Sequence, residues 1–133
     1  MEKIGNKRKE RLYLSSTDKS SGDNEDFRIS FPTIENVYTM EWASCYNVSG
    51  QKILSIDEFN TGRHSNGVAF WRVLDTSTNQ RNNSTPWDNF PDDSGRRKIN
   101  TLHLKLYNID GTPCTNTDVT TPWGIELDVF CID

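Results

Sequence analysis

Apolar and polar residues alternate at the start of the stretch FRISFPTIENVYTMEWASCYNV (Phe27–Val48), around which the expected sheet is organised. A period of two is typical of a half-buried strand. Pro32 has no N–H to donate to a ladder, so we expect the first strand to end there. A second strand is expected from Val37 to Tyr46. Apolar residues occur in both of its rows, which indicates a strand that is covered on both faces.

The same pattern predicts further strands before and after this pair. Leu102 and Leu104 share one face of Ile99–Tyr107. His103 lies on the other face, where we expect it to be solvated. Gln51–Phe59 fits a strand, or a strand followed by a short helix. The expected strands are Leu12–Ser15, Val68–Leu74, Ile99–Tyr107 and Trp123–Ile132, and the expected loops are Ser16–Asp26, Asp75–Lys98 and Thr112–Pro122.

The pattern contains no amphipathic helical period and no internal repeat. About 7–8 strands separated by long polar loops predict an all-β fold, an antiparallel β-sandwich with jelly-roll-like topology. A chain of 133 residues has the length of one domain, which we assign to residues 12–133. Only 33% of the residues are hydrophobic, but 11% are aromatic. This combination favours a folded core with polar loops over disorder.

Charge is unevenly distributed, with a basic arm at residues 1–11. The arm holds five bases and two acids, a formal charge of +3, and the net charge of the chain is −4, so the rest carries −7. A basic arm on an acidic body can bind a polyanion or a neighbouring protein. The alternative is a solvated terminus without a function. The five bases are Lys3, Lys7, Arg8, Lys9 and Arg11.

Side chains that support catalysis or metal binding are few. Cys45, Cys114 and Cys131 have no CxxC spacing, which argues against a disulfide framework or a zinc site. The two histidines lie in a polar loop (His64) and on the polar face of a strand (His103). We find no nucleophile elbow, P-loop, dinucleotide-binding or zinc-protease motif. We therefore expect no catalytic residues, no metal site and no cofactor, and we expect that the protein is not an enzyme.

The loop Asp75–Lys98 is unusually long for a compact domain, which is typical of a segment with a function or of a mobile one. It carries Trp87 and Phe90 between two prolines. These aromatic residues should pack on their own sheet or on a neighbouring subunit, or bind a sugar, so they are candidate interface residues. The acids of Asp88–Asp93 in the same loop do not match the calcium-loop pattern, and we expect them to be solvated.

Two groups of motifs resemble one family. The first group consists of LYLSSTDKSSG (Leu12–Gly22), DFRISFP (Asp26–Pro32), IENV (Ile34–Val37) and CYNV (Cys45–Val48). The second consists of INTLHLKLYNIDGTP (Ile99–Pro113) and WGIEL (Trp123–Leu127). In their order and spacing, these motifs resemble the small virion proteins of large DNA viruses of eukaryotes, of virophages and of polinton-like viruses. The family usually has Pro-Asn before the YNV element, where this chain has Ala43-Ser44-Cys45, and the resemblance does not extend to Gly50–Lys98.

The resemblance implies a jelly-roll or β-sandwich minor capsid or penton (vertex) protein. We expect a structural virion protein that assembles with other capsid proteins, as a homo-oligomer within the particle, through apolar patches and sheet edges. The basic arm would contact a neighbour or, weakly, nucleic acid by neutralising phosphates. We expect no membrane span, synthesis in the host cytoplasm and a final location in the virion. The alternative is a carbohydrate- or receptor-binding β-sandwich, such as a host-attachment head, that uses Trp87 and Phe90.

If the aromatic loop contacts a neighbouring subunit, Trp87→Ala should leave the melting temperature of the monomer unchanged and abolish oligomerisation. The reason is that a docked Trp contributes a large apolar area only to the surface that it covers. Thermal melting and size-exclusion chromatography with light scattering measure the two effects. A loss of monomer stability would instead assign Trp87 to the core of its own domain.

Overall fold

The computed structural model describes residues 7–48, 50–58, 60, 62–75 and 97–132, and nearly all of its regular structure is β-strand. All of the strand pairs are antiparallel, so the prediction of an all-β antiparallel fold is confirmed. In chain order the elements are β1 (Lys7–Ser15), a 3₁₀ helix η1 (Ser16–Asp18), β2 (Ser21–Asp23), β3 (Asp26–Tyr46), β4 (Gln51–Ile56), β5 (Gly62–Arg63), β6 (Ala69–Phe70), β7 (Arg72–Asp75), β8 (Arg97–Tyr107) and β9 (Gly124–Ile132).

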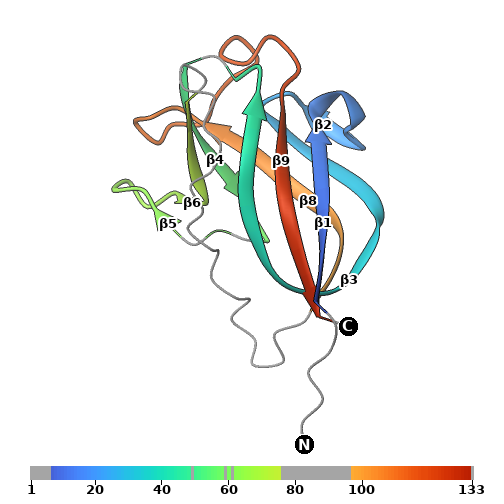
Figure 1. The fold of residues 1–133 in the computed structure, drawn as a ribbon. Helices are drawn as coiled ribbons and strands as arrows, with labels where there is room; N and C mark the ends of the chain where they lie inside the picture. Colours follow the sequence, from blue (N-terminus) through green and yellow to red (C-terminus); the bar gives the residue numbers. More distant parts are fainter. Residues whose placement is uncertain (1–6, 49, 59, 61, 76–96, 133) are drawn as a thin grey trace, which may run out of the picture.

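Seven of the described strands form one curled sheet with the order β1-β9-β3-β8-β4-β7, in which β2 pairs with the start of β3, and β5 and β6 form a separate two-stranded sheet. The long strand β3 is shared between two layers (Figure 1). Its second half pairs with β9, and β1 completes this layer, which we call the front layer. Its first half pairs with β8, which continues to β4 and β7 in the back layer. Because Lys7 on β1 pairs with Ile132 on β9, the first and last described residues lie side by side.

Pro32 does not end a strand as expected, because it lies inside β3, where the chain bends. The register of β3 against β8 shifts between Ser30 and Ile34, and again between Ile34 and Val37. A proline at such an irregular point removes no ladder hydrogen bond, which explains why it is tolerated. Asn36 adopts a φ of 60°, a conformation that Asn accepts more readily than most residues.

The apolar residues in both rows of the second half of β3 are explained by bulges. The register against β9 shifts between Val37 and Thr39 and again between Trp42 and Ser44. A bulge adds one residue and reverses which row faces inward. Met40 is fully buried before the second shift, and Cys45 is buried after it. The backbone of Trp42 pairs with Leu127, and its side chain lies outside the described part of the structure.

Other element boundaries differ from the prediction. The first strand begins at Lys7 rather than at Leu12, so the end of the predicted basic arm belongs to the sheet. The expected strand Val68–Leu74 is divided into β6 and β7, and the buried Trp71 lies between them. The predicted loop after Ser15 contains η1 and β2. β4 ends at Ile56 and is followed by a turn at Asp57 and Glu58, and no helix follows it among the described residues.

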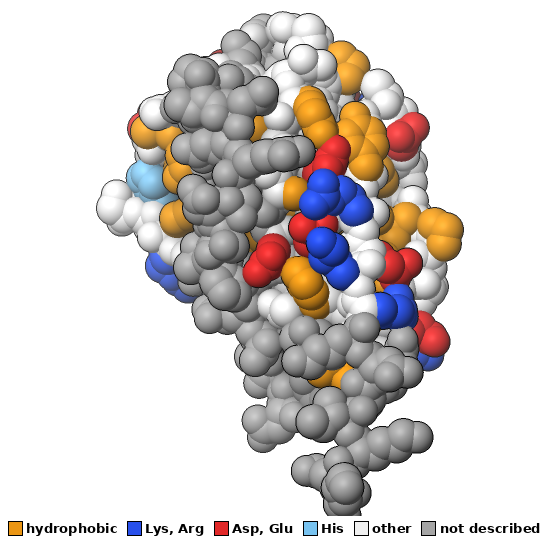
Figure 2. All heavy atoms as spheres, viewed as in Figure 1, with side chains coloured by type: hydrophobic (Ala, Val, Ile, Leu, Met, Phe, Trp, Pro, Cys, Tyr) orange, Lys and Arg blue, Asp and Glu red, His pale blue; other side chains and the backbone are white. Residues whose placement is uncertain are grey.

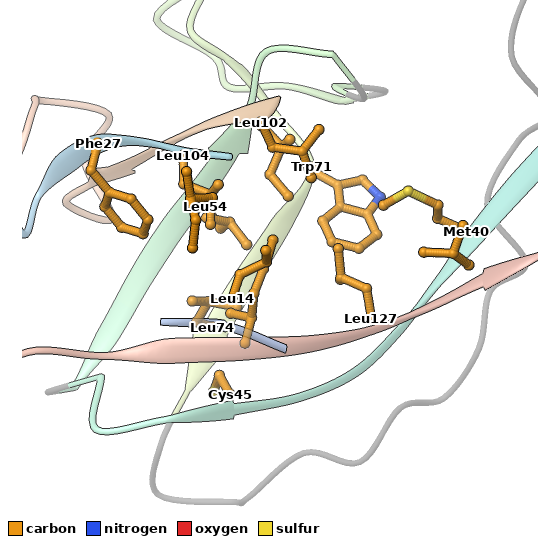
Figure 3. Close-up of a cluster of buried hydrophobic side chains, with 14 of the residues drawn as sticks. Leu14, Phe27, Met40, Cys45, Leu54, Trp71, Leu74, Leu102, Leu104 and Leu127 are labelled. Carbon is orange, nitrogen blue, oxygen red and sulfur yellow. The ribbon is translucent and has the colours of Figure 1, made fainter. Parts of the chain in front are cut away.

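The two layers enclose one apolar core, and side chains from both point into it (Figure 3). The row Leu102, Leu104 and Leu106 on β8 is buried, as its alternation predicted. Phe27 meets Trp123 edge to face, with ring centroids 5.5 Å apart. The largest fully buried side chains are Trp123, Phe27, Leu14, Met40, Leu54, Ile56, Leu74, Leu102, Leu104, Leu106, Ile125 and Leu127.

Leu104→Ala should lower the free energy of unfolding by about 2–5 kcal/mol, because it leaves a cavity between the layers. Leu104 is 0% exposed and pairs with both Phe27 and Ile56. The matched control is Val73→Ala on β7, where the side chain is 46% exposed and the loss should stay below about 1 kcal/mol. Urea denaturation of both variants checks the prediction. Equal losses would mean that β8 faces the core with its other row.

Candidate functional site

The predicted site residues are only partly within the described structure. Trp87, Phe90 and Lys3 lie outside the described residues. The other four bases of the predicted arm, Lys7, Arg8, Lys9 and Arg11, belong to β1. The front layer therefore carries most of the predicted basic arm, and its charges must be considered together with those of the neighbouring strand β9.

Arg11 is held by two carboxylates of β9 on the outer face of the front layer. Its Nε and Nη2 donate to the two oxygens of Asp128 at 2.7 and 3.0 Å, and its Nη1 donates to Glu126 at 3.1 Å. The hydrogen bonds to Asp128 and the charge of that carboxylate raise the pKa of Arg11. Figure 2 shows basic and acidic side chains next to one another along the middle of this face. Arg11 is thus neutralised within its own domain.

Arg8 is also engaged within its own domain. It forms an ion pair with Glu10 and donates from Nη2 to the carbonyl oxygen of Glu35 at 3.2 Å. Arg8 and Arg11 are therefore part of the sheet and engaged within it, and a contact of these bases with a polyanion or a neighbour stays a prediction. Strand pairing brings Arg11 to two acids that are distant in the sequence, whereas the acid that pairs with Arg8 is Glu10, two residues away.

Two exposed tyrosines lie on the same outer face. Tyr13 is 53% exposed and Tyr46 is 39% exposed, and their rings meet edge to face at 5.7 Å. The Tyr46 hydroxyl donates to Glu126, and this hydrogen bond raises the pKa of Tyr46. Gly124 makes room for the pair, because a Cβ there would lie 3.2 Å from the Tyr13 hydroxyl and 2.8 Å from the Leu14 carbonyl oxygen. An aromatic ring over a glycine is a known way to cover a gap in a sheet.

On the outer face of the back layer, His103 lies between two carboxylates. Its Nδ1 is 2.6 Å from Oδ2 of Asp57, and its Nε2 forms a short contact with Oδ1 of Asp26. The side chain of His103 is only 18% exposed. The expectation that His103 is solvated is therefore wrong. We call Asp26, His103 and Asp57 the histidine cluster.

Three elements position the histidine cluster. On β3, Arg28 is opposite His103, and Asp26 is opposite Lys105, so Asp26 is a diagonal neighbour of the histidine. Asp57 follows β4, and its backbone N–H donates to the carbonyl oxygen of His103 at 3.2 Å. The backbone N–H of His103 donates to Oε1 of Glu58 at 3.1 Å. The turn after β4 thus continues the sheet next to His103.

The cluster favours a protonated imidazole. Ionised carboxylates only accept hydrogen bonds, so two of them require an N–H on both ring nitrogens. Burial alone would lower the pKa of His103, but the hydrogen bonds and charges of Asp26 and Asp57 outweigh burial and raise it. An imidazolium has no lone pair with which to accept a proton, so this arrangement does not suit a general base. It suits an ionic contact between strands.

A polar groove of about 430 Å³ adjoins the histidine cluster. In it, Oε2 of Glu25 is buried and has no hydrogen-bond partner among the described residues. Within those residues, no three His, Cys, Asp or Glu side chains are grouped so that they could hold a metal ion. The lining consists of Ser21, Gly22, Asp23, Glu25, Asp26, Phe27, Arg28, His103, Lys105, Pro113 and Cys114.

Cys114 is the thiol next to this groove, and it is not arranged as a nucleophile. It is 6% exposed, and burial raises its pKa to about 11. The thiolate is the reactive form of cysteine. Both nitrogens of His103 are already engaged with carboxylates. The groove therefore offers no activated Cys–His pair.

The three thiols should be unreactive in the folded protein. Cys45, Cys114 and Cys131 are all buried, and Cys114, with a pKa of about 11, is roughly one part in a thousand thiolate at pH 8. An aromatic disulfide reagent should label none of them within minutes in buffer and all of them in guanidinium chloride. The Cys114→Ser variant shows whether any residual labelling of the native protein occurs at Cys114. Rapid labelling of Cys114 in the native protein would contradict its burial.

The chain was compared with known proteins. No protein-family model matches it, and no curated protein matches its sequence. In the part of the chain that the structure describes, no helix is long and apolar enough to cross a membrane.

Proposed function

We propose that this protein is a structural subunit of a virus particle, a jelly-roll minor capsid or vertex component that assembles with other capsid proteins. The observation that carries the proposal is the strand order. The two-layer sandwich with its first strand beside its last is compatible with a jelly roll, an architecture that occurs in viral capsid and lectin domains. The sequence motifs that resemble small virion proteins support the same function.

The pairing can be compared with a jelly roll strand by strand. Strands lettered B to I in chain order form the sheets B-I-D-G and C-H-E-F in a jelly roll. In this chain the front layer has the order β1, β9 and second half of β3, which corresponds to B-I-D. The back layer has the order first half of β3, β8, β4 and β7, which corresponds to C-H-E-F. Strand G has no counterpart among the described strands, and residues 76–96, between β7 and β8, lie outside the described residues.

Contacts between subunits are more favourable on the layer faces than at the edge formed by β1. An exposed edge strand can pair with another chain, and charged residues in its inward row oppose such pairing. Glu10 pairs with the buried Val129, so its row faces inward, and Arg8 lies in the same row. The outer face of the front layer instead presents Tyr13 and Tyr46, residues of a type that is enriched in protein interfaces.

The alternative function is binding of a carbohydrate by the same outer face. The exposed ring of Tyr13 could stack on a sugar, and Glu126 lies beside the neighbouring Tyr46. Aromatic rings next to polar groups are common in sites for polar ligands. Trp87 and Phe90, which the sequence suggested for this role, lie outside the described residues.

Two experiments separate the functions. Mass spectrometry of purified particles should detect the chain at a fixed ratio to the major capsid protein, and particle density should contain its sandwich. A glycan array probed with the purified domain tests the alternative. Absence of the chain from particles, together with glycan binding that Tyr13→Ala removes, would replace the capsid proposal with the lectin-like one.

Deleting residues 1–6 should leave the melting temperature unchanged and weaken assembly, because this part of the predicted arm precedes β1 and would contact a neighbour in the proposed particle. Deleting residues 1–10 should destabilise the domain, because Lys7 to Glu10 pair with Ile132 to Val129 on β9. This prediction differs from the sequence-based assignment of the domain to residues 12–133, because β1 begins at Lys7. Melting curves and sedimentation of assembled material compare the two truncations. Full assembly without residues 1–6 would exclude the arm as a contact.

A further inference from the structure

We propose that the histidine cluster is a pH-dependent clamp, which holds the turn after β4 against the back layer while His103 is protonated and releases it when His103 loses its proton. The inference goes beyond the proposed function and does not depend on it. It rests on the position of one imidazole between carboxylates from two separate elements.

The clamp joins β8 to the start of β3 and to the turn after β4. Asp26 begins β3, and Asp57 lies in the turn that leaves β4, yet both contact the ring of His103 on β8. Two hydrogen bonds also join the turn to the backbone of His103. The Asp57 N–H donates to the His103 carbonyl oxygen, and the His103 N–H donates to the Glu58 carboxylate. Side-chain and backbone contacts therefore hold the same turn.

Loss of one proton from His103 turns one of its two attractive contacts with a carboxylate into a repulsive one. A neutral imidazole keeps one N–H and exposes a lone pair on the other nitrogen. That lone pair would then face a carboxylate oxygen at hydrogen-bond distance, where two acceptors repel each other. The clamp cannot remain closed on both sides without the proton.

The positive charge of the imidazolium compensates part of an excess of negative charge around it. The acids near it are Asp26 on β3, Asp57 and Glu58 in the turn, and Asp23 and Glu25 along the adjoining groove. The bases near it are Arg28 on β3 and Lys105 on β8. Acids outnumber these bases, so deprotonation of His103 leaves the carboxylates of the turn and of β3 with less compensating charge.

The sign of the pH dependence follows from the direction of the shift. The pKa of His103 is raised in the folded protein, and the unfolded histidine titrates near about 6.5. The contribution to stability is therefore complete below about 6.5 and is lost as the pH rises through the folded pKa. The clamp is closed in mildly acidic conditions and opens toward alkaline pH.

Nuclear magnetic resonance of the full chain tests the clamp directly, because the sequence has only two histidines. The ring of His64 contacts Asn66 and the carbonyl oxygen of Ile109 rather than a carboxylate, and His64→Gln assigns the two signals. The imidazole of His103 should titrate at a higher pH in the folded chain than in urea. A folded midpoint at or below the unfolded one would overturn the proposal.

Melting curves between pH 5.5 and 9 test the consequence. The wild type should be more stable than His103→Gln by several degrees at low pH, and the two should converge at high pH, whereas His64→Gln should keep the pH dependence of the wild type. Hydrogen exchange, corrected for its intrinsic pH dependence, should show lower protection of the Asp57 and His103 amides above the folded midpoint. Parallel curves for wild type and His103→Gln, or unchanged protection, would overturn the clamp. If His103→Gln does not fold, the titration and exchange of the wild type decide.

Discussion

The fold depends on the bend in β3. A strand of 21 residues would extend roughly 70 Å if straight, at about 3.3 Å per residue. A domain of this length has a radius of gyration of only about 14 Å. The strand must therefore turn within the domain, and its backbone groups must still find partners on both sides of the turn. It does so by pairing with β8 before the bend and with β9 after it.

The bend explains both what could be predicted from the sequence and what could not. The leucines of β8 are buried as predicted, and the expected last strand, β9, also buries an alternating row, because regular pairing preserves a period of two. The continuity of β3 was not predictable from Pro32, because the effect of a proline depends on whether its position carries a ladder hydrogen bond. The bulges between Val37 and Thr39 and between Trp42 and Ser44 were not predictable either, since they arise from the register against a distant strand.

The partners of the charged groups also depend on strand pairing and could not be predicted from local sequence. Sequence composition identified the bases at the start of the chain but not the acids that neutralise them. Arg11 meets Asp128 because β1 and β9 pair at that register, and His103 meets Asp26 because β3 and β8 pair at theirs. Nothing in the spacing of these residues along the chain indicates such contacts. The signal that could have found these contacts is an acid opposite a base when the predicted strands are paired in antiparallel register.

The two outer faces of the sandwich respond differently to pH. On the front layer, Arg11 and Tyr46 keep their protons through neutral pH, and the hydrogen bonds to Asp128 and Glu126 raise both pKa values further. On the back layer, one imidazolium holds the turn after β4, and its proton is the group that is exchanged near neutrality. A contact with another subunit through the front face would therefore persist while the back face loosens. If the protein assembles as proposed, a change of pH would alter the conformation of a subunit without detaching it from its neighbour.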